Sequence, residues 1–128
     1  MQFNSLIPEL SVSDIHRSVQ FYQKLGFEIQ YERIEDKFYF LQLENNQIML
    51  EEVNNNWNTA ALEYPYGRGM NLSMRVSDID AMFQRLQQLN ISFFEELETH
   101  AYQVGDSISY DREFLIQDPD GYLLRFND

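Results

Sequence analysis

The sequence repeats itself halfway along the chain. The segment VSDIHRSVQFYQKLGFEIQYE, which starts at Val12, aligns without a gap with VSDIDAMFQRLQQLNISFFEE, which starts at Val76, at an offset of 64 residues. Val-Ser-Asp-Ile is identical in both segments, and further identities join Gln20 to Gln84, Leu25 to Leu89 and Glu32 to Glu96. Such a repeat indicates that the fold is built from two copies of one supersecondary unit.

Each copy has the same predicted order of elements. The runs LIPELSV and MNLSMRV alternate apolar and polar residues, as in a half-buried strand. Asp14 and Asp78 then stand where a carboxylate caps a helix, and Gly26 and Asn90 are suited to end it in a left-handed conformation. The apolar helix faces consist of Ile15, Val19 and Tyr22 in the first copy and of Ile79, Phe83, Leu86 and Leu89 in the second. Three strand-like runs follow each helix, at 27–34, 37–43 and 47–53 and at 92–97, 113–117 and 122–126.

These elements predict an α+β fold of two tandem βαβββ modules, at about 1–53 and 69–128, joined by the linker 54–68 into a single domain. Two such modules can form a curved, mostly antiparallel sheet around a cleft, with the helices on its outer face. The polar segment 99–111 is expected to be a long loop, and loops of that length are often functional or mobile.

Strand alternation assigns the two faces of each sheet. The residues expected under the helices are Leu6, Leu10 and Val12 in the first copy and Met70, Leu72, Met74 and Val76 in the second. The opposite face carries Ser5, Ile7, Glu9, Ser11, Asn71, Ser73 and Arg75. Aligning NNQIMLE with PDGYLLR places Glu51 and Arg125 on that face at equivalent positions. Such a face can simply be exposed to water, or two such faces can enclose a cleft.

The charge is strongly acidic. Nine basic and twenty-one acidic residues give 9 − 21 = −12, which opposes nucleic acids and anionic membranes and attracts cationic ligands, although acidity can also serve solubility alone. Cysteine is absent, which excludes disulfides and thiolate chemistry. The start MQFNSLIPEL lacks the pattern of a signal peptide and no apolar run is long enough for a membrane span, so we expect a cytoplasmic protein.

The duplicated unit, the opening PELSVSDIHRSVQFYQKLGF and the closing REFLIQDPDGYLLRF together resemble the vicinal oxygen chelate superfamily. Its members include glyoxalase I, extradiol dioxygenases, fosfomycin-resistance enzymes and bleomycin-resistance proteins. In metal-dependent members four ligands come from the first and last strands of each copy, and the resemblance places them here at Ile7, Glu51, Asn71 and Arg125. Only Glu51 suits a divalent metal, so the resemblance implies no metal, no cofactor and no catalytic residue of the family's kind.

Within the superfamily the chain is most similar to the bleomycin-resistance proteins, which are not enzymes. This resemblance implies a homodimer that sequesters a cationic aromatic small molecule. The candidate ligand-binding residues are Glu9, Glu51, Trp57, Tyr64, Tyr66, Asn71, Arg75, Tyr102, Tyr110 and Arg125, with Arg125 expected to pair with Glu51. Aromatic rings would stack on the ligand and carboxylates would hold its cationic groups. The alternatives are an enzyme of the superfamily with an altered site, in which Glu9 and Glu51 are an acid/base pair, and a small-molecule sensor.

Overall fold

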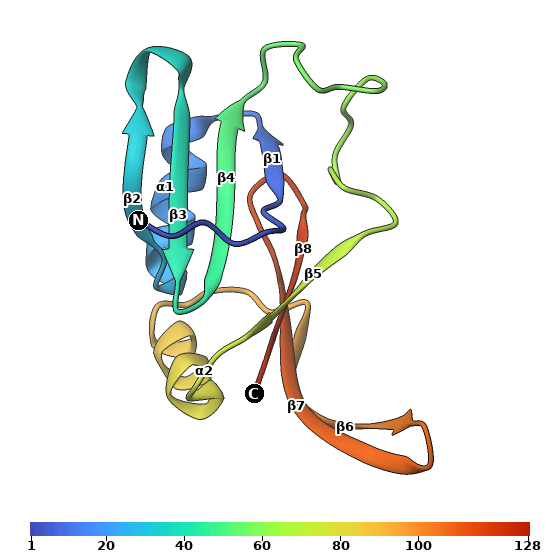
Figure 1. Ribbon diagram of the computed structural model, residues 1–128. Coiled ribbons are helices and arrows are strands. Elements are labelled where there is room, and N and C mark those ends of the chain that lie inside the picture. The colour runs from blue at the N-terminus through green and yellow to red at the C-terminus, as the bar shows by residue number, and fades with distance from the viewer. The chain divides into compact units, whose positions relative to one another are not determined.

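The computed structural model describes all residues, 1–128. The chain divides into two compact units, Met1–Tyr66 and Gly67–Asp128, which we call module 1 and module 2. Each has the order βαβββ (Figure 1). Module 1 contains β1 (Glu9–Val12), α1 (Ile15–Leu25), β2 (Glu28–Arg33), the short 3₁₀ helix η1 (Ile34–Asp36), β3 (Phe38–Leu43) and β4 (Asn46–Glu52). Module 2 contains β5 (Asn71–Arg75), α2 (Ile79–Gln88), β6 (Glu95–Val104), β7 (Ser107–Gln117) and β8 (Leu123–Asn127).

Both modules form a mixed four-stranded sheet. The strand orders are β1-β4-β3-β2 and β5-β8-β7-β6, and in each module the first strand pairs in parallel with the last while the other pairs are antiparallel. The predicted α+β fold of two βαβββ modules is therefore confirmed. A cleft enclosed by both modules stays a prediction. Neither α1 nor α2 is long and apolar enough to cross a membrane.

The helix boundaries follow the repeat. Asp14 accepts a hydrogen bond from the backbone N–H of Arg17, and Asp78 does the same for Ala81, which satisfies free donors in the first turn of each helix. Gly26 and Asn90 both have positive φ, 112° and 58°, and reverse the chain as predicted.

The cores lie between each helix and its sheet. The fully buried side chains in module 1 include Tyr22, Leu25, Leu41, Ile48 and Leu50, and those in module 2 include Ile79, Leu86, Phe114, Ile116 and Phe126. Three predicted core residues are wrong: Leu6, Met70 and Leu89 are 85%, 48% and 47% exposed. Leu6 and Met70 precede the first residues of β1 and β5, so the alternation does not extend to them, and Leu89 lies at the end of α2 where the chain turns away.

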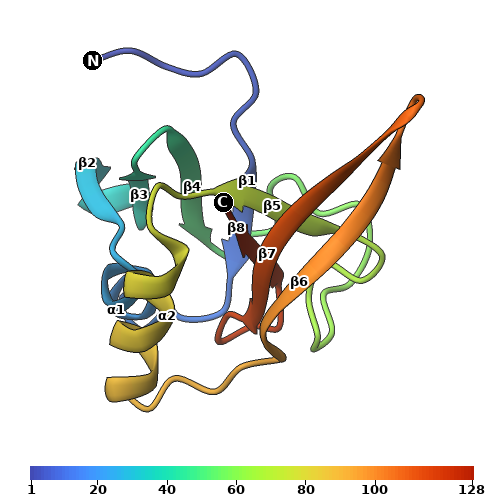
Figure 2. The ribbon, with the colours of Figure 1, turned by 90° about the horizontal axis from the view of Figure 1, so that it is seen from below.

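The segment 99–111, expected to be a loop, is instead most of a β-hairpin. β6 pairs with β7 from Glu95 to the turn at Gly105, whose φ of 59° suits the first central position of a tight hairpin turn. Only Glu113–Gln117 of β7 also pairs with β8, so the rest of the hairpin is a two-stranded ribbon that extends beyond the sheet (Figure 2). Polar residues on a ribbon exposed on both faces give no strand-like hydrophobic pattern.

The strand registers correct the equivalence of Glu51 and Arg125. In module 1 Met49 pairs with Glu9, and in module 2 Arg125 pairs with Ser73. Because the offset of 64 residues relates Glu9 to Ser73, the equivalent of Arg125 is Met49. The alignment of the two last strands was two residues out of register. Alternation does not reveal this error, because Met49 and Glu51 lie on the same face of β4.

Candidate functional site

The face of the module 1 sheet away from α1 is ordered in two rows that cross all four strands. The first row runs Tyr31, Phe40, Met49, Glu9, and the second runs Arg33, Phe38, Glu51, Ser11. Rings thus occupy the β2–β3 side of this face, and carboxylates occupy the β4–β1 side. Arg33 lies over the Phe38 ring, with its guanidinium carbon 3.8 Å from the ring centroid.

The two carboxylates of this face interact. The pKa of Glu9 lies above its usual range, because its carboxyl group is partly removed from water and because Glu51 is both its hydrogen-bond partner and a like charge. Arg33 acts in the opposite direction, since a nearby positive charge favours the ionised form. Glu9 and Glu51 therefore form an acidic pair, and a cation bound there would favour the ionised form of Glu9.

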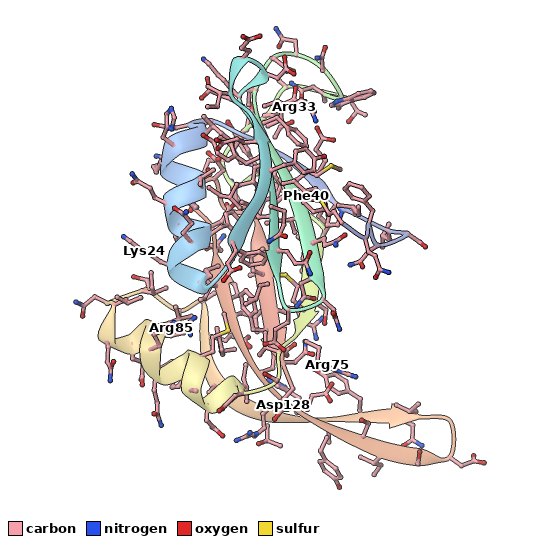
Figure 3. All side chains as sticks on the ribbon, turned by 60° about the vertical axis from the view of Figure 1, so that its left-hand side comes forward. Lys24, Arg33, Phe40, Arg75, Arg85 and Asp128 are labelled. Atoms are coloured by element: carbon pink, nitrogen blue, oxygen red, sulfur yellow. The ribbon has the colours of Figure 1, made fainter.

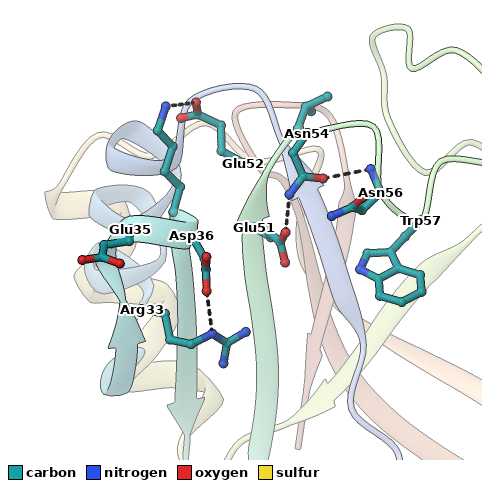
Figure 4. A pocket seen from close by; sticks show the side chains of 10 residues that line it. Arg33, Glu35, Asp36, Glu51, Glu52, Asn54, Asn56 and Trp57 are labelled. Carbon is teal, nitrogen blue, oxygen red and sulfur yellow. Dashed lines mark hydrogen bonds and ion pairs between the residues drawn. The ribbon is translucent and has the colours of Figure 1, made fainter.

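A cavity of about 550 Å³ opens beside this pair (Figure 4). Its lining consists of Arg33, Glu35, Asp36, Lys37, Glu51, Glu52, Val53, Asn54, Asn56 and Trp57. The carboxylate of Glu51 accepts a hydrogen bond from the Asn54 amide, and the Trp57 side chain borders the cavity while 80% exposed. The cavity combines a carboxylate with a large accessible ring, which are the two groups that a cationic aromatic molecule needs.

The cations around this cavity already have partners. Arg33 pairs with Asp36 at 3.2 Å, and Lys37 pairs with Glu52 at 3.0 Å. Glu52 also accepts a hydrogen bond from the backbone N–H of Ile15 at the start of α1, and this bond and the Lys37 ammonium hold its pKa below the usual range. Glu52 is therefore a structural carboxylate, whereas the hydrogen-bond partners of Glu51 are an amide and another acid.

In module 2 the corresponding face carries the guanidinium of Arg125, and its hydrogen-bond partners belong to the same module. The guanidinium of Arg125 donates from Nε to Glu113 at 2.7 Å and also donates to Asn71 and to the hydroxyl of Tyr102. Glu113 is 4% exposed and raises the pKa of Arg125, mainly through this hydrogen bond. The ion pair predicted between Arg125 and Glu51 joins two modules and stays a prediction.

The family's metal does not fit the carried-over positions. Ile7 precedes β1 and has no donor atom, while the guanidinium of Arg125 uses the side-chain oxygens of Asn71 and Glu113. A different group, formed by Glu95, Glu98 and His100, has ligand atoms within 4.8 Å of one another on β6. His100 Nε2 lies 3.7 Å from both Glu98 and Glu113, so its neighbours belong to module 2.

The structure thus sorts the predicted ligand-binding residues into groups. Glu9, Glu51 and Trp57 lie at or beside the module 1 cavity. Asn71, Tyr102 and Arg125 are joined by hydrogen bonds in module 2. Four predicted residues lie outside both groups: Tyr64 and Tyr66 in the linker, Arg75 at the end of β5, and Tyr110 on the ribbon face opposite Tyr102.

Sequence reasoning missed Arg33 and Glu113. Arg33 lies in a strand pattern that was assigned no face, and Glu113 opens the run EFLIQ, where it was counted only as the start of a strand. The hairpin pairing Glu98↔Glu113 places Glu113 beside His100 and Tyr102. This pairing could not be foreseen, because the segment 99–111, which forms most of the hairpin, was expected to be a loop.

Comparison with known proteins identifies the family. The model of the Glyoxalase/Bleomycin resistance protein/Dioxygenase superfamily matches residues 3–126, so the chain belongs to this superfamily, as the resemblance predicted. A member of the superfamily from Vibrio splendidus 12B01 is 35% identical, with 93% of each chain covered and a TM-score of 0.43. TioX from Micromonospora sp. ML1 is 18% identical, with 98% of each chain covered and a TM-score of 0.74.

A bleomycin-binding protein solved in complex with bleomycin is 19% identical, with 98% of each chain covered and a TM-score of 0.68. At these identities TioX and the bleomycin-binding protein show the shared fold alone. The search of curated proteins gave no match.

The Arg125–Glu113 pair predicts a specific loss of stability. Replacing Arg125 by Met leaves the buried Glu113 carboxylate without its main partner, so we expect the free energy of unfolding in urea to fall by about 2–3 kcal/mol. Arg112→Met is the matched control, because Arg112 also bridges two carboxylates, Asp80 and Asp128, but does so at the surface, and its loss should be clearly smaller. Equal losses in the two variants would contradict the role assigned to Glu113.

Proposed function

We propose that the protein binds and sequesters a cationic aromatic small molecule without transforming it, with bleomycin-type antibiotics as the reference ligands. The observation that carries this proposal is the module 1 cavity, in which Glu51 and the exposed ring of Trp57 share one lining and Glu9 adjoins Glu51. A ligand ring can stack on the indole while its cationic group reaches the acidic pair. The superfamily membership supports this reading, since one solved structure of the same fold is a bleomycin complex.

The charge of the whole chain supports the same ligand class. A net charge of −12 raises the local concentration of cations around the protein and speeds their association. Around the cavity, Arg33 pairs with Asp36 and Lys37 pairs with Glu52, so these charges compensate one another. Glu35 and Glu51 of the same lining keep the cavity negatively charged.

Titration with metal-free bleomycin tests the proposal directly. Because Trp57 is the single tryptophan, its fluorescence should change saturably at micromolar ligand, and it should do so equally after dialysis against a chelator. Glu51→Gln should weaken binding by about tenfold, the equivalent of one charge-assisted hydrogen bond. Glu32→Gln is the matched control, because it removes the same charge from β2 on the other face of the sheet.

Two results would count against this function. The absence of any change at high micromolar bleomycin would contradict ligand binding. Recovery of a chemically altered ligand would instead favour an enzyme of the superfamily.

The pKa of Glu9 gives the binding a predicted pH dependence. A bound cation interacts with the ionised carboxylate of Glu9, and the raised pKa of Glu9 means that this group is still partly protonated at pH values where an ordinary glutamate is charged. Affinity should therefore increase as pH rises through the pKa of Glu9, and binding in that range should be accompanied by proton release. Glu9→Gln should remove this dependence, as measured by calorimetry in buffers of different ionisation heat.

The proposal includes a homodimer. Ile108 and Tyr110 lie on the same face of the β6–β7 ribbon and are exposed, and neighbouring apolar side chains on a surface often mark a contact with another protein. Ile108→Ser combined with Tyr110→Ser should shift the protein from dimer to monomer in sedimentation velocity at micromolar concentration. Val104→Ser, on the opposite face of the ribbon, serves as the control, and a monomeric parent protein would contradict this part of the proposal.

A further inference from the structure

We infer that Tyr31 and Phe40 form a second binding position, for a flat ring tethered to the cation held by Glu9 and Glu51, and that Phe3 of the same chain occupies this position in the absence of ligand. The inference rests on the proposed function and extends it, because it specifies the shape of the ligand and a competitor that the ligand must displace.

The ring position is an aromatic cluster on the sheet face away from α1. Tyr31 and Phe40 are cross-strand partners, and their rings stack with centroids 5.2 Å apart and an interplanar angle of 8°. Phe38 extends the cluster, with its ring 5.9 Å from Tyr31. Stacked rings on the same sheet face as the two carboxylates offer a further ring a face or an edge to pack against.

Phe3 already covers this cluster. Its ring meets Phe40 edge-on at 5.3 Å and Tyr31 at 6.4 Å, in the T-shaped geometry that aromatic rings adopt with one another. Figures 1 and 2 show the N-terminal segment (residues 1–8) crossing β3 and β4 on the side of the sheet opposite α1. A ring of the chain thus lies where we place a ring of the ligand.

The N-terminal segment is attached through few contacts. The backbone N–H of Asn4 donates to the side chain of Gln47 at 2.7 Å, Gln47 donates back to the carbonyl of Gln2 at 2.8 Å, and the Asn4 side chain donates to the carbonyl of Asn45. Residues 1–8 form no strand, and the Phe3 side chain remains 57% exposed. Pro8, next to β1, also accepts a hydrogen bond from the backbone N–H of Met49 at 2.9 Å. The part that carries Phe3 is held by one glutamine, one carbonyl and one half-covered ring, and can be displaced by a ligand of moderate affinity.

The same row of the sheet contains the cationic position. Phe40 on β3 and Glu9 on β1 lie in one row with β4 between them, so two strand spacings, roughly 10 Å, separate the ring position from the acidic pair. A ligand that fills both positions needs an amine or guanidine joined to a flat ring by a tether of about that length. Figure 3 shows Phe40 in the middle of this sheet, with Arg33 toward one end.

Binding of naphthyl-alkylammonium ions with short and long tethers tests the inference, alongside metal-free bleomycin. We expect the affinity to be highest for the tether that spans the two positions, and N-acetylation of the amine should abolish this preference. Phe3→Ala should tighten binding about fivefold, because the competing ring is gone. Phe3→Tyr, which keeps a ring, and Leu6→Ala, which changes an exposed residue of the same segment, should bind like the parent protein.

Hydrogen exchange supplies an independent measurement. The amide of Asn4 should be protected in the free protein and should lose that protection when ligand saturates the site. If the parent protein binds but Phe3→Ala does not bind more tightly, or if Asn4 stays protected, the competition by Phe3 is wrong while the proposed function stands. If neither protein binds bleomycin or any ammonium ion, the proposed function is wrong and this inference falls with it.

Discussion

The parallel pairing of the first and last strands of each module is the constraint on which the rest of the structure depends. A parallel pair cannot be closed by a tight turn and needs a long connection, which in this chain consists of a helix and two further strands between β1 and β4, and likewise between β5 and β8. This pairing also decides which side chains share a row. Glu9 lies beside Met49, and Ser73 lies beside Arg125, although both modules have the same order of elements.

The sequence was sufficient for those parts of the fold that depend on local chemistry. Asp14 and Asp78 identified both helix starts, and Gly26 and Asn90 identified both ends, because caps and left-handed residues act within a few positions of the chain. The β6–β7 ribbon was missed because its outer part is exposed on both faces, so nothing in its composition distinguishes it from a polar loop. Burial gives strands their periodic pattern, and this hairpin has little burial.

The candidate site was predicted only in part, for a similar reason. Alternation placed Glu9, Glu51 and Arg125 on the correct faces, because it depends only on whether residues are an odd or an even number of positions apart along a strand. It could not fix the register between strands, and so Arg125 was aligned with Glu51 where the ladders align it with Met49. The contact between Phe3 and Phe40 joins the chain terminus to a central strand, and no local pattern in the sequence indicates it.

The equivalent positions of the two sheets show what the duplication has left free to vary. The carboxylate of Glu9 in module 1 corresponds to the hydroxyl of Ser73 in module 2. The thioether of Met49 corresponds to the guanidinium of Arg125, and the acid Glu51 corresponds to the amide Asn127. The two modules share a backbone and their helix caps, while the side chains at these three pairs of positions differ in chemistry. Each sheet therefore presents its own set of groups to a ligand: an acidic pair on module 1 and, on module 2, a guanidinium whose nearest carboxylate already holds it.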